Sequence, residues 1–300
     1  MQKIIPNIWC NGNAREAAEF YTATFPNSDI VGTSYYPNSA EDGLADFQLD
    51  MAGKELTVDF EVAGFRFSLI NADDTFAPNL TISFFVNFDP SRGETKEQLD
   101  ELWTKLTDGG QVIMPLDTYD WSEYYGWVQD KYGVSWQLML SDPAGDPRPF
   151  IVPSLQFAGP VQNRGAQAID YYTSVFKNSE KASAWPYGEP AGPATADSLM
   201  YADFQLDGQW FAANDSGVEQ TDAFSAGISL MINCKDQEEI DYFWEKLSSV
   251  PEAEQCGWCQ DKFGVSWQVV PENMEELMKK PGAYKTLMNQ HKIVIAEYYH

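Results

Sequence analysis

The apolar positions of the chain switch between a period near two and a period near 3.6. Residues 3–10 form a short apolar-rich run, which predicts a strand, and apolar positions at helical spacing follow as far as Phe25. Period-two alternation returns at 45–51 and 65–69, and a further strand is expected at 29–36. This stretch therefore predicts the order βαβββ.

The next stretch of the chain predicts the same order of elements. Asn13 and Glu16 give a capping signal for the first helix, and Thr95 and Gln98 give the same signal for a second helix that ends at Gly109. The remaining strands are expected at 81–88, 111–116, 124–130 and 134–140. Two βαβββ modules in one half of the chain indicate a domain of the α+β class.

The second half of the chain repeats the first. Residues 126–137 and 257–268 are identical at ten of twelve positions. The hexapeptide Ala-Asp-Phe-Gln-Leu-Asp occurs at 45–50 and again at 202–207. We interpret both pairs as corresponding segments of a tandem duplication, because self-similarity of this kind marks a repeated structural unit.

A linker separates the two copies. Residues 141–149 contain three prolines and a glycine, which is typical of a stiff connection. We therefore expect one domain at 1–145 and a second at 150–270. Residues 271–300 have helical patterning, and this extension is expected to pack on the second domain or across the domain interface.

Charge and composition narrow the classes of function. The chain has 45 acidic and 19 basic residues, and its formal net charge of −26 repels nucleic acids and anionic membranes. No apolar run reaches the roughly 18 residues of a membrane span, and the first residues do not read as a secretory signal. We expect an acidic cytoplasmic protein with a small-molecule partner and neither a nucleic-acid nor a membrane partner.

Two motifs carry a resemblance to a known superfamily. The segment from Pro6 to Tyr21 reads Pro-x-x-x-x-x-Gly-Asn-Ala-x-x-Ala-x-x-Phe-Tyr, and Asp130 to Gln137 reads Asp-Lys-x-Gly-Val-x-Trp-Gln. With the paired modules, they resemble the vicinal oxygen chelate superfamily of glyoxalases, bleomycin-resistance proteins and dioxygenases. Within it, the match is to the PhnB-like branch, which is labelled 3-demethylubiquinone methyltransferase-like. The resemblance implies tandem glyoxalase-like domains, in each of which two βαβββ modules form a curved mixed sheet around a cavity.

The same resemblance bears on metals. Metal-using members hold a cation through His or Gln on an opening strand and Glu on a closing strand. Here the opening position falls on Pro6 and Pro153 and the closing position on Gln137 and Gln268, while both histidines lie after the two copies. We therefore expect no metal and no other cofactor, with a divalent metal as the alternative.

The two glutamines are also the first candidates for contact with a ligand. Gln137 and Gln268 alternate with Trp136 and Trp267, so they point to the face that lines the cavity in the superfamily. They are either amides that orient a ligand or buried amides bonded to the backbone. Aromatic residues that could line the pocket, or simply form core, are Trp9, Trp121, Tyr125 and Trp127 in copy one and Trp185, Trp210 and Trp258 in copy two.

Other chemistry is not indicated. Cys256 and Cys259 spell Cys-x-x-Cys, but the counterpart 125–128 has no cysteine, and residues three apart on a strand face opposite ways, so a redox role is not expected. The methyltransferase label is unsupported, since no Gly-x-Gly-x-x-Gly loop follows a strand.

The leading hypothesis is a metal-independent small-molecule binding protein whose ligand the sequence does not identify. The alternative is an enzyme, with lyase, isomerase or dioxygenase-like activity and a non-standard site. The duplication also suggests a fused pseudo-dimer, either a monomer or a weak homodimer, in which one copy has kept a pocket that the other has lost.

Overall fold

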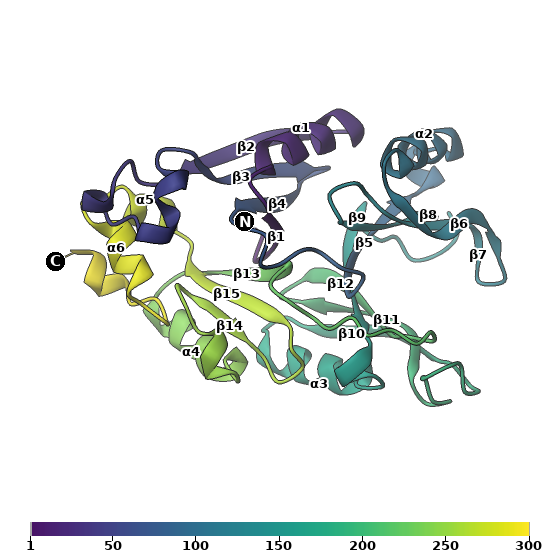
Figure 1. Cartoon of the computed structure of the whole chain (residues 1–300). Helices are drawn as coiled ribbons and strands as arrows, with labels where there is room; N and C mark the ends of the chain where they lie inside the picture. Colours follow the sequence, from purple (N-terminus) through teal and green to yellow (C-terminus); the bar gives the residue numbers. More distant parts are fainter. Residues whose placement is uncertain (1, 300) are drawn as a thin grey trace.

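Four modules follow one another along the chain in the computed structural model, which describes residues 2–299 (Figure 1). The first comprises β1 (Ile4–Cys10), α1 (Ala14–Thr24), β2 (Ser28–Tyr35), β3 (Glu55–Val62) and β4 (Phe65–Asn71). The second comprises β5 (Ile82–Phe88), α2 (Lys96–Thr107), β6 (Gln111–Tyr119), β7 (Ser122–Gln129) and β8 (Ser135–Leu140). Both have the predicted order βαβββ.

The second copy supplies the other two modules. The third comprises β9 (Ile151–Phe157), α3 (Gly165–Val175), β10 (Glu180–Pro186), β11 (Leu199–Leu206) and β12 (Gln209–Asp215). The fourth comprises β13 (Ile228–Cys234), α4 (Gln237–Leu247), β14 (Trp258–Gln260) and β15 (Ser266–Pro271), and α5 (Met274–Met278) and α6 (Ala283–Met288) follow it. The prediction of βαβββ is incomplete here, because the short 3-10 turn Pro251–Ala253 stands where the second module has β6.

Each sheet combines one module from each copy. Sheet A has seven strands in the order β14-β15-β13-β1-β4-β3-β2, and sheet B has eight in the order β10-β11-β12-β9-β5-β8-β7-β6. Antiparallel pairing of β1 with β13 and of β5 with β9 joins the copies. The α+β class is confirmed, but the expectation that both modules of one copy share a sheet is corrected: the first module pairs with the fourth, and the second with the third.

Contacts between helices and strands hold each copy together. Tyr21 on α1 donates to Asp130 Oδ2 at 2.9 Å, and Trp136 Nε1 on β8 donates to the same oxygen at 2.8 Å. The hydroxyl of Tyr172 donates to Asp261 Oδ2 in the second copy. The helices thus cover one face of each sheet, with the fully buried aromatic side chains of the core beneath them. We call the opposite face of each sheet its open face.

The repeated hexapeptide has two different structures. At 202–207 it forms most of β11, as predicted, whereas at 45–50 it lies in a 3-10 helix (Asp46–Met51) with Phe47 79% exposed. The prediction of a strand at 45–51 is wrong. The segment of copy one that occupies the position of β11 is β3, because Asp59 pairs with Ser68 just as Asp203 pairs with Ala212.

The carboxyl-terminal extension contacts the first module as well as the fourth. Tyr284 of α6 packs against Tyr36 and Leu44, which belong to the long connection between β2 and β3. Figure 1 shows this connection beside α5 and α6. Gly257 and Ile293 bring the same extension onto the fourth module, so the expected packing across the domain interface is present.

The helix caps differ from the expected ones in one case. Thr95 and Gln98 form the predicted capping box of α2. Asn13 makes no side-chain cap on α1; the backbone N–H of Ala14 instead donates to Asn71 Oδ1 at 2.9 Å from the end of β4. Within residues 2–299, no helix has the length and apolar character that crossing a bilayer requires.

Candidate functional site on the open faces

A row of polar side chains crosses the open face of sheet A. Asn7 on β1 lies opposite Ser68 on β4 and Ser229 on β13, and directly opposed residues point to the same side. Gln268 on β15 joins them, because its Nε2 donates to Ser229 Oγ at 2.9 Å. All four are buried, with 0–7% exposure. We call these four residues polar row A, and each copy contributes two of them.

Asn7 is the unusual member of polar row A. Its Oδ1 is buried and accepts no hydrogen bond from any residue in the described part of the chain. A buried acceptor without a donor costs about 1–3 kcal/mol, so natural proteins rarely keep one without a reason. The unused acceptor capacity of Asn7 Oδ1 therefore calls for an explanation.

Two tryptophans from different copies frame polar row A. Trp9 lies two residues after Asn7 on β1, and Trp258 is the register partner of Gln268. Their ring centroids are 6.0 Å apart with an interplanar angle of 77°. Trp9 Nε1 donates to the carbonyl of Asp73 at 2.7 Å, which fixes the orientation of that ring. Both rings are only half-buried, so they offer apolar surface beside the polar row.

Sheet B carries a corresponding row with different bonding. Ser83 on β5 lies opposite Ser154 on β9 and Ser135 on β8, and Gln137 Nε2 donates to Ser83 Oγ at 2.7 Å. We call these four residues polar row B. Here the glutamine oxygen is also satisfied, because Tyr125 donates to Gln137 Oε1 at 2.6 Å.

Aromatic side chains fill the open face of sheet B. Trp127 Nε1 donates to Ser135 Oγ at 2.5 Å, and burial raises the pKa of the Tyr125 phenol far above its ordinary value, so it stays a hydrogen-bond donor. Trp121 is 54% exposed and meets the Tyr125 ring edge-on at 4.5 Å. In polar row B the Gln137 amide is thus bonded through both its oxygen and its nitrogen, whereas in polar row A the buried Asn7 Oδ1 has no donor within residues 2–299.

The predicted site residues fall into two groups that cut across the copies. The open face of sheet A holds Trp9, Trp258 and Gln268, and that of sheet B holds Trp121, Tyr125, Trp127, Gln137 and Trp210. Trp185 on the edge strand β10 is 60% exposed. Sequence reasoning named Ser83 and Ser229 only as residues that stand in place of a metal-binding histidine, and it missed Asn7. The alternation of Asn7 with the core residues Ile4, Pro6 and Ile8 was the signal that could have found it.

Polar row A does not fit a divalent metal. Pro6, the expected opening position, alternates with Asn7 and so points to the core side. The four side chains of polar row A are neutral amides and hydroxyls, and the carboxylate of Asp59 on the same face is paired with Arg66. Transition metals in proteins favour imidazole, thiolate and carboxylate. No group of three or more His, Cys, Asp and Glu side chains within 2–299 is arranged to hold a metal ion.

The cysteines are all free. Cys259 is buried in the core and burial raises its pKa, whereas Cys256 is half-buried at a turn with φ of 54°. Neither thiol has the lowered pKa of a redox Cys-x-x-Cys site.

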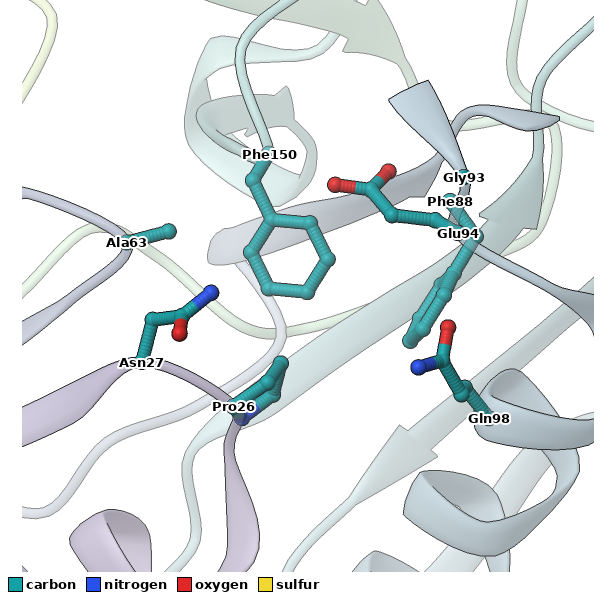
Figure 2. Close-up of a pocket in the computed structure, with 8 residues that line it drawn as sticks. All are labelled: Pro26, Asn27, Ala63, Phe88, Gly93, Glu94, Gln98 and Phe150. Carbon is teal, nitrogen blue, oxygen red and sulfur yellow. The ribbon is translucent and has the colours of Figure 1, made fainter. Parts of the chain in front are cut away.

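Two hollows lie elsewhere on the molecule. The smaller, of about 100 Å³, is shown in Figure 2, where the rings of Phe88 and Phe150 point between Asn27 and Gln98. It is below the roughly 300 Å³ of an ordinary ligand pocket. The larger, of about 390 Å³, is lined by Gly12, Met51, Gly53, Lys54, Glu55 and Asn71 at the end of β1 and β4. Neither contains a residue of the polar rows.

The two copies each match one protein family. The family described as "3-demethylubiquinone-9 3-methyltransferase" matches residues 2–139 and 149–270. The chain belongs to this family. A PhnB protein from Bacillus cereus, described as a putative 3-demethylubiquinone-9 3-methyltransferase, is 36% identical over 47% of the chain and 100% of its own length, with a TM-score of 0.37.

Glyoxalase I from Zea mays shows that the fold extends over both copies. It is 11% identical and covers 97% of both chains with a TM-score of 0.54. The predicted tandem glyoxalase-like organisation, consistent with the vicinal oxygen chelate superfamily, is confirmed. No curated protein matches the chain.

Proposed function

We propose that the chain is a metal-independent small-molecule binding protein whose ligand lies on the open face of sheet A. The observation that carries the proposal is Asn7 Oδ1, a buried acceptor without a donor in the middle of polar row A. The ligand supplies the missing N–H or O–H group, and its apolar part rests on Trp9 and Trp258. A flat molecule with a hydrogen-bond donor at one edge fits both features.

Binding is favoured over catalysis by the chemistry of the row. Asn7, Ser68, Ser229 and Gln268 are amides and hydroxyls, none of which titrates near neutral pH, and general acid–base catalysis needs a group that does. Methyl transfer, the activity in the family's description, is not part of the proposal, because no glycine-rich cofactor loop accompanies the strands.

We also propose that the chain acts as a monomer. The pairing of β1 with β13 and of β5 with β9 supplies within one chain the contacts that would otherwise need a second subunit. Light scattering after size exclusion should give the mass of one chain, and a tight dimer would contradict this part of the proposal.

The decisive variant is Asn7→Leu, which removes the unpaired acceptor and keeps the branching and the number of heavy atoms of the side chain. We expect this protein to be as stable as the wild type or more stable, by up to about 3 kcal/mol in urea unfolding, because a buried unsatisfied amide is lost. Compounds found by thermal-shift screening of small aromatic amides and alcohols should lose binding to it. Ser154→Ala, at the same position of sheet B, should leave their binding unchanged.

Two results would count against the proposal. If Asn7→Leu is destabilised, the amide has a structural partner and the argument from its free oxygen fails. If calorimetry with zinc, nickel or manganese on chelator-treated protein shows a tight stoichiometric site, metal independence is wrong.

A further inference from the structure

The open faces of the two sheets carry aspartates at equivalent positions. Asp59 on β3 pairs with Ser68, and Asp203 on β11 pairs with Ala212, so the two carboxylates occupy matching places. Each is neutralised by an arginine. In sheet A this is Arg66, whose Nη2 lies 2.6 Å from Asp59 Oδ2.

The arginine of sheet B comes from a different part of the chain. The position that Arg66 holds on β4 is taken by Trp210 on β12, since Glu61 pairs with Arg66 and Gln205 pairs with Trp210. The cation that meets Asp203 is instead Arg148 of the linker between the copies. The second copy therefore has the carboxylate but no arginine at the equivalent strand position.

The surroundings of Arg148 resemble those of a bound cation. Its Nε and Nη2 both lie 2.8 Å from Asp203 Oδ2, and its guanidinium carbon lies 3.9 Å from the centroid of the Trp210 ring. Asp203 Oδ1 accepts from the backbone N–H of Ser183 at 2.8 Å, which fixes the carboxylate. Its side chain is only 5% exposed. A buried carboxylate beside an aromatic face is an arrangement that recognises organic cations.

The linker itself has little to hold it in place. Residues 142–147 are all exposed, and only Ser141 and Arg148 of the linker are half-buried. The backbone next to it makes two side-chain contacts, from Arg92 Nη1 to the Arg148 carbonyl at 2.6 Å and from Asn87 Nδ2 to the Pro149 carbonyl at 2.8 Å. The exposed residues 142–147 add little to this, so the free-energy cost of opening the segment lies chiefly in the Arg148–Asp203 pair and these two backbone contacts.

We infer that Asp203, Trp210 and Ser183 form a recognition site for a guanidinium or ammonium group, which Arg148 fills from within the same chain. An external organic cation occupies the site when the linker moves aside. The net charge of −26 raises the local concentration of such cations. The site lies on sheet B and is independent of the binding proposed for polar row A on sheet A.

The internal arginine competes with any external cation. A tethered group acts at an effective concentration in the millimolar range, so removing it should strengthen the apparent affinity for an external cation by about tenfold or more. Arg148→Ala is the direct variant. Arg148→Met keeps the unbranched stem over Trp210 and serves where the alanine variant does not fold.

Methylguanidinium is the probe, and the indole N–H signal of Trp210 in ¹⁵N-labelled protein is the reporter, assigned with Trp210→Phe. We expect a saturable shift in Arg148→Ala or Arg148→Met at lower probe concentration than in the wild type. Urea, which has the same shape without the charge, should give none. Adding Asp203→Asn to either variant should abolish the shift.

A matched control comes from sheet A. Arg66→Ala removes the twin arginine but leaves Arg148 in place, so the Trp210 signal should respond to methylguanidinium as in the wild type. The inference is overturned if folded Arg148→Met shows no saturable shift at Trp210, or if urea shifts the signal equally. Neither outcome depends on whether the ligand proposed for sheet A exists.

Discussion

The buried aspartate at the end of each copy gives the sharpest test of how the domains are held together. Asp130 is 4% exposed and accepts four hydrogen bonds. Its Oδ2 accepts from Tyr21 and Trp136, and its Oδ1 from the backbone N–H groups of Tyr132 and Val134 at 2.8 and 3.1 Å. The substitution Asp130→Asn keeps the shape and replaces one oxygen with an NH₂ group.

The cost follows from counting donors and acceptors. The amide oxygen of the substituted side chain can still accept the two backbone N–H groups, and the Tyr21 hydroxyl can rotate to accept from the new NH₂. The Trp136 N–H has no acceptor left, and a buried unpaired donor costs about 1–3 kcal/mol. The surviving bonds also lose their charge-assisted part, which is partly offset by cheaper burial of a neutral group. We expect a loss of about 2–4 kcal/mol, and more than about 4 kcal/mol for Asp130→Ala, which leaves four donors unpaired.

The assay is urea unfolding of the full chain, followed by tryptophan fluorescence and by far-ultraviolet circular dichroism. The second copy supplies an internal replicate, because Asp261 receives the same four kinds of bond, and Asp261→Asn should cost a similar amount. A double-mutant cycle with Trp136→Phe should show coupling between the tryptophan and the carboxylate. A loss below about 1 kcal/mol for both asparagine variants would refute the donor count.

Three further predictions concern local packing and reactivity. Gly227→Ala places a Cβ 1.9 Å from the carbonyl oxygen of Ala77, so the backbone must shift. The free energy of unfolding in urea should fall by more than about 3 kcal/mol, which exceeds an ordinary overpacking cost. An unchanged free energy of unfolding would contradict this contact. Asn71→Ala removes the cap of α1 and should cost about 1 kcal/mol, measured in the same way, whereas no change would show that the cap contributes nothing. Burial raises the pKa of Cys10 to about 12, and only the thiolate form of a cysteine reacts with iodoacetamide. At pH 8 this reagent should label the half-buried Cys256 first and Cys10 only after unfolding. Mass spectrometry that showed the reverse order of labelling would refute this prediction.

The duplication and most of the elements could be predicted from the sequence, because the closing motif specifies a local structure. Within 126–137 and its repeat, the aspartate binds backbone groups two and four residues ahead and a tryptophan six residues ahead. Those contacts are contained in the motif itself. Of the four hydrogen bonds to Asp130, only the one from Tyr21 comes from outside the motif, and a pattern whose contacts are mostly local is readable with little knowledge of the rest of the chain.

The shared hexapeptide was misleading for the opposite reason. At 202–207 it pairs with β10 and β12 and buries Phe204 completely, whereas at 45–50 it lies in the connection between β2 and β3 and pairs with no strand among residues 2–299. Strand formation depends on what lies next to a segment more than on its residues. The counterpart of β11 in copy one, β3, shares only Asp59 and Phe60 with it over the equivalent positions 58–62. Identity over six residues was weaker evidence than position in the module.

Which module pairs with which in a sheet could not be predicted from the sequence either. All four modules have the same kind of apolar face and edge, so their order along the chain does not say which strands will meet. The candidate site depended on that pairing. Trp9 and Trp258 lie in different copies, and only the joining of β1 to β13 brings them within 6.0 Å. The expected metal position is displaced as well, because the motif places it at Pro6 whereas Asn7 faces the site.

The crossed pairing of modules also explains how the two open faces could become different. If two identical single-copy chains paired in this way, both faces would carry the same residues. In the fused chain, a change in the first module alters sheet A alone, and a change in the third alters sheet B alone. The two sheets differ in this way at two positions. Asn7 lies opposite Ser229 in sheet A, whereas Ser154 lies opposite Ser83 in sheet B. Arg66 on β4 of sheet A corresponds to Trp210 on β12 of sheet B. Duplication followed by independent change of each sheet therefore accounts for one face that keeps a free acceptor and another that is filled by aromatic rings and the linker arginine.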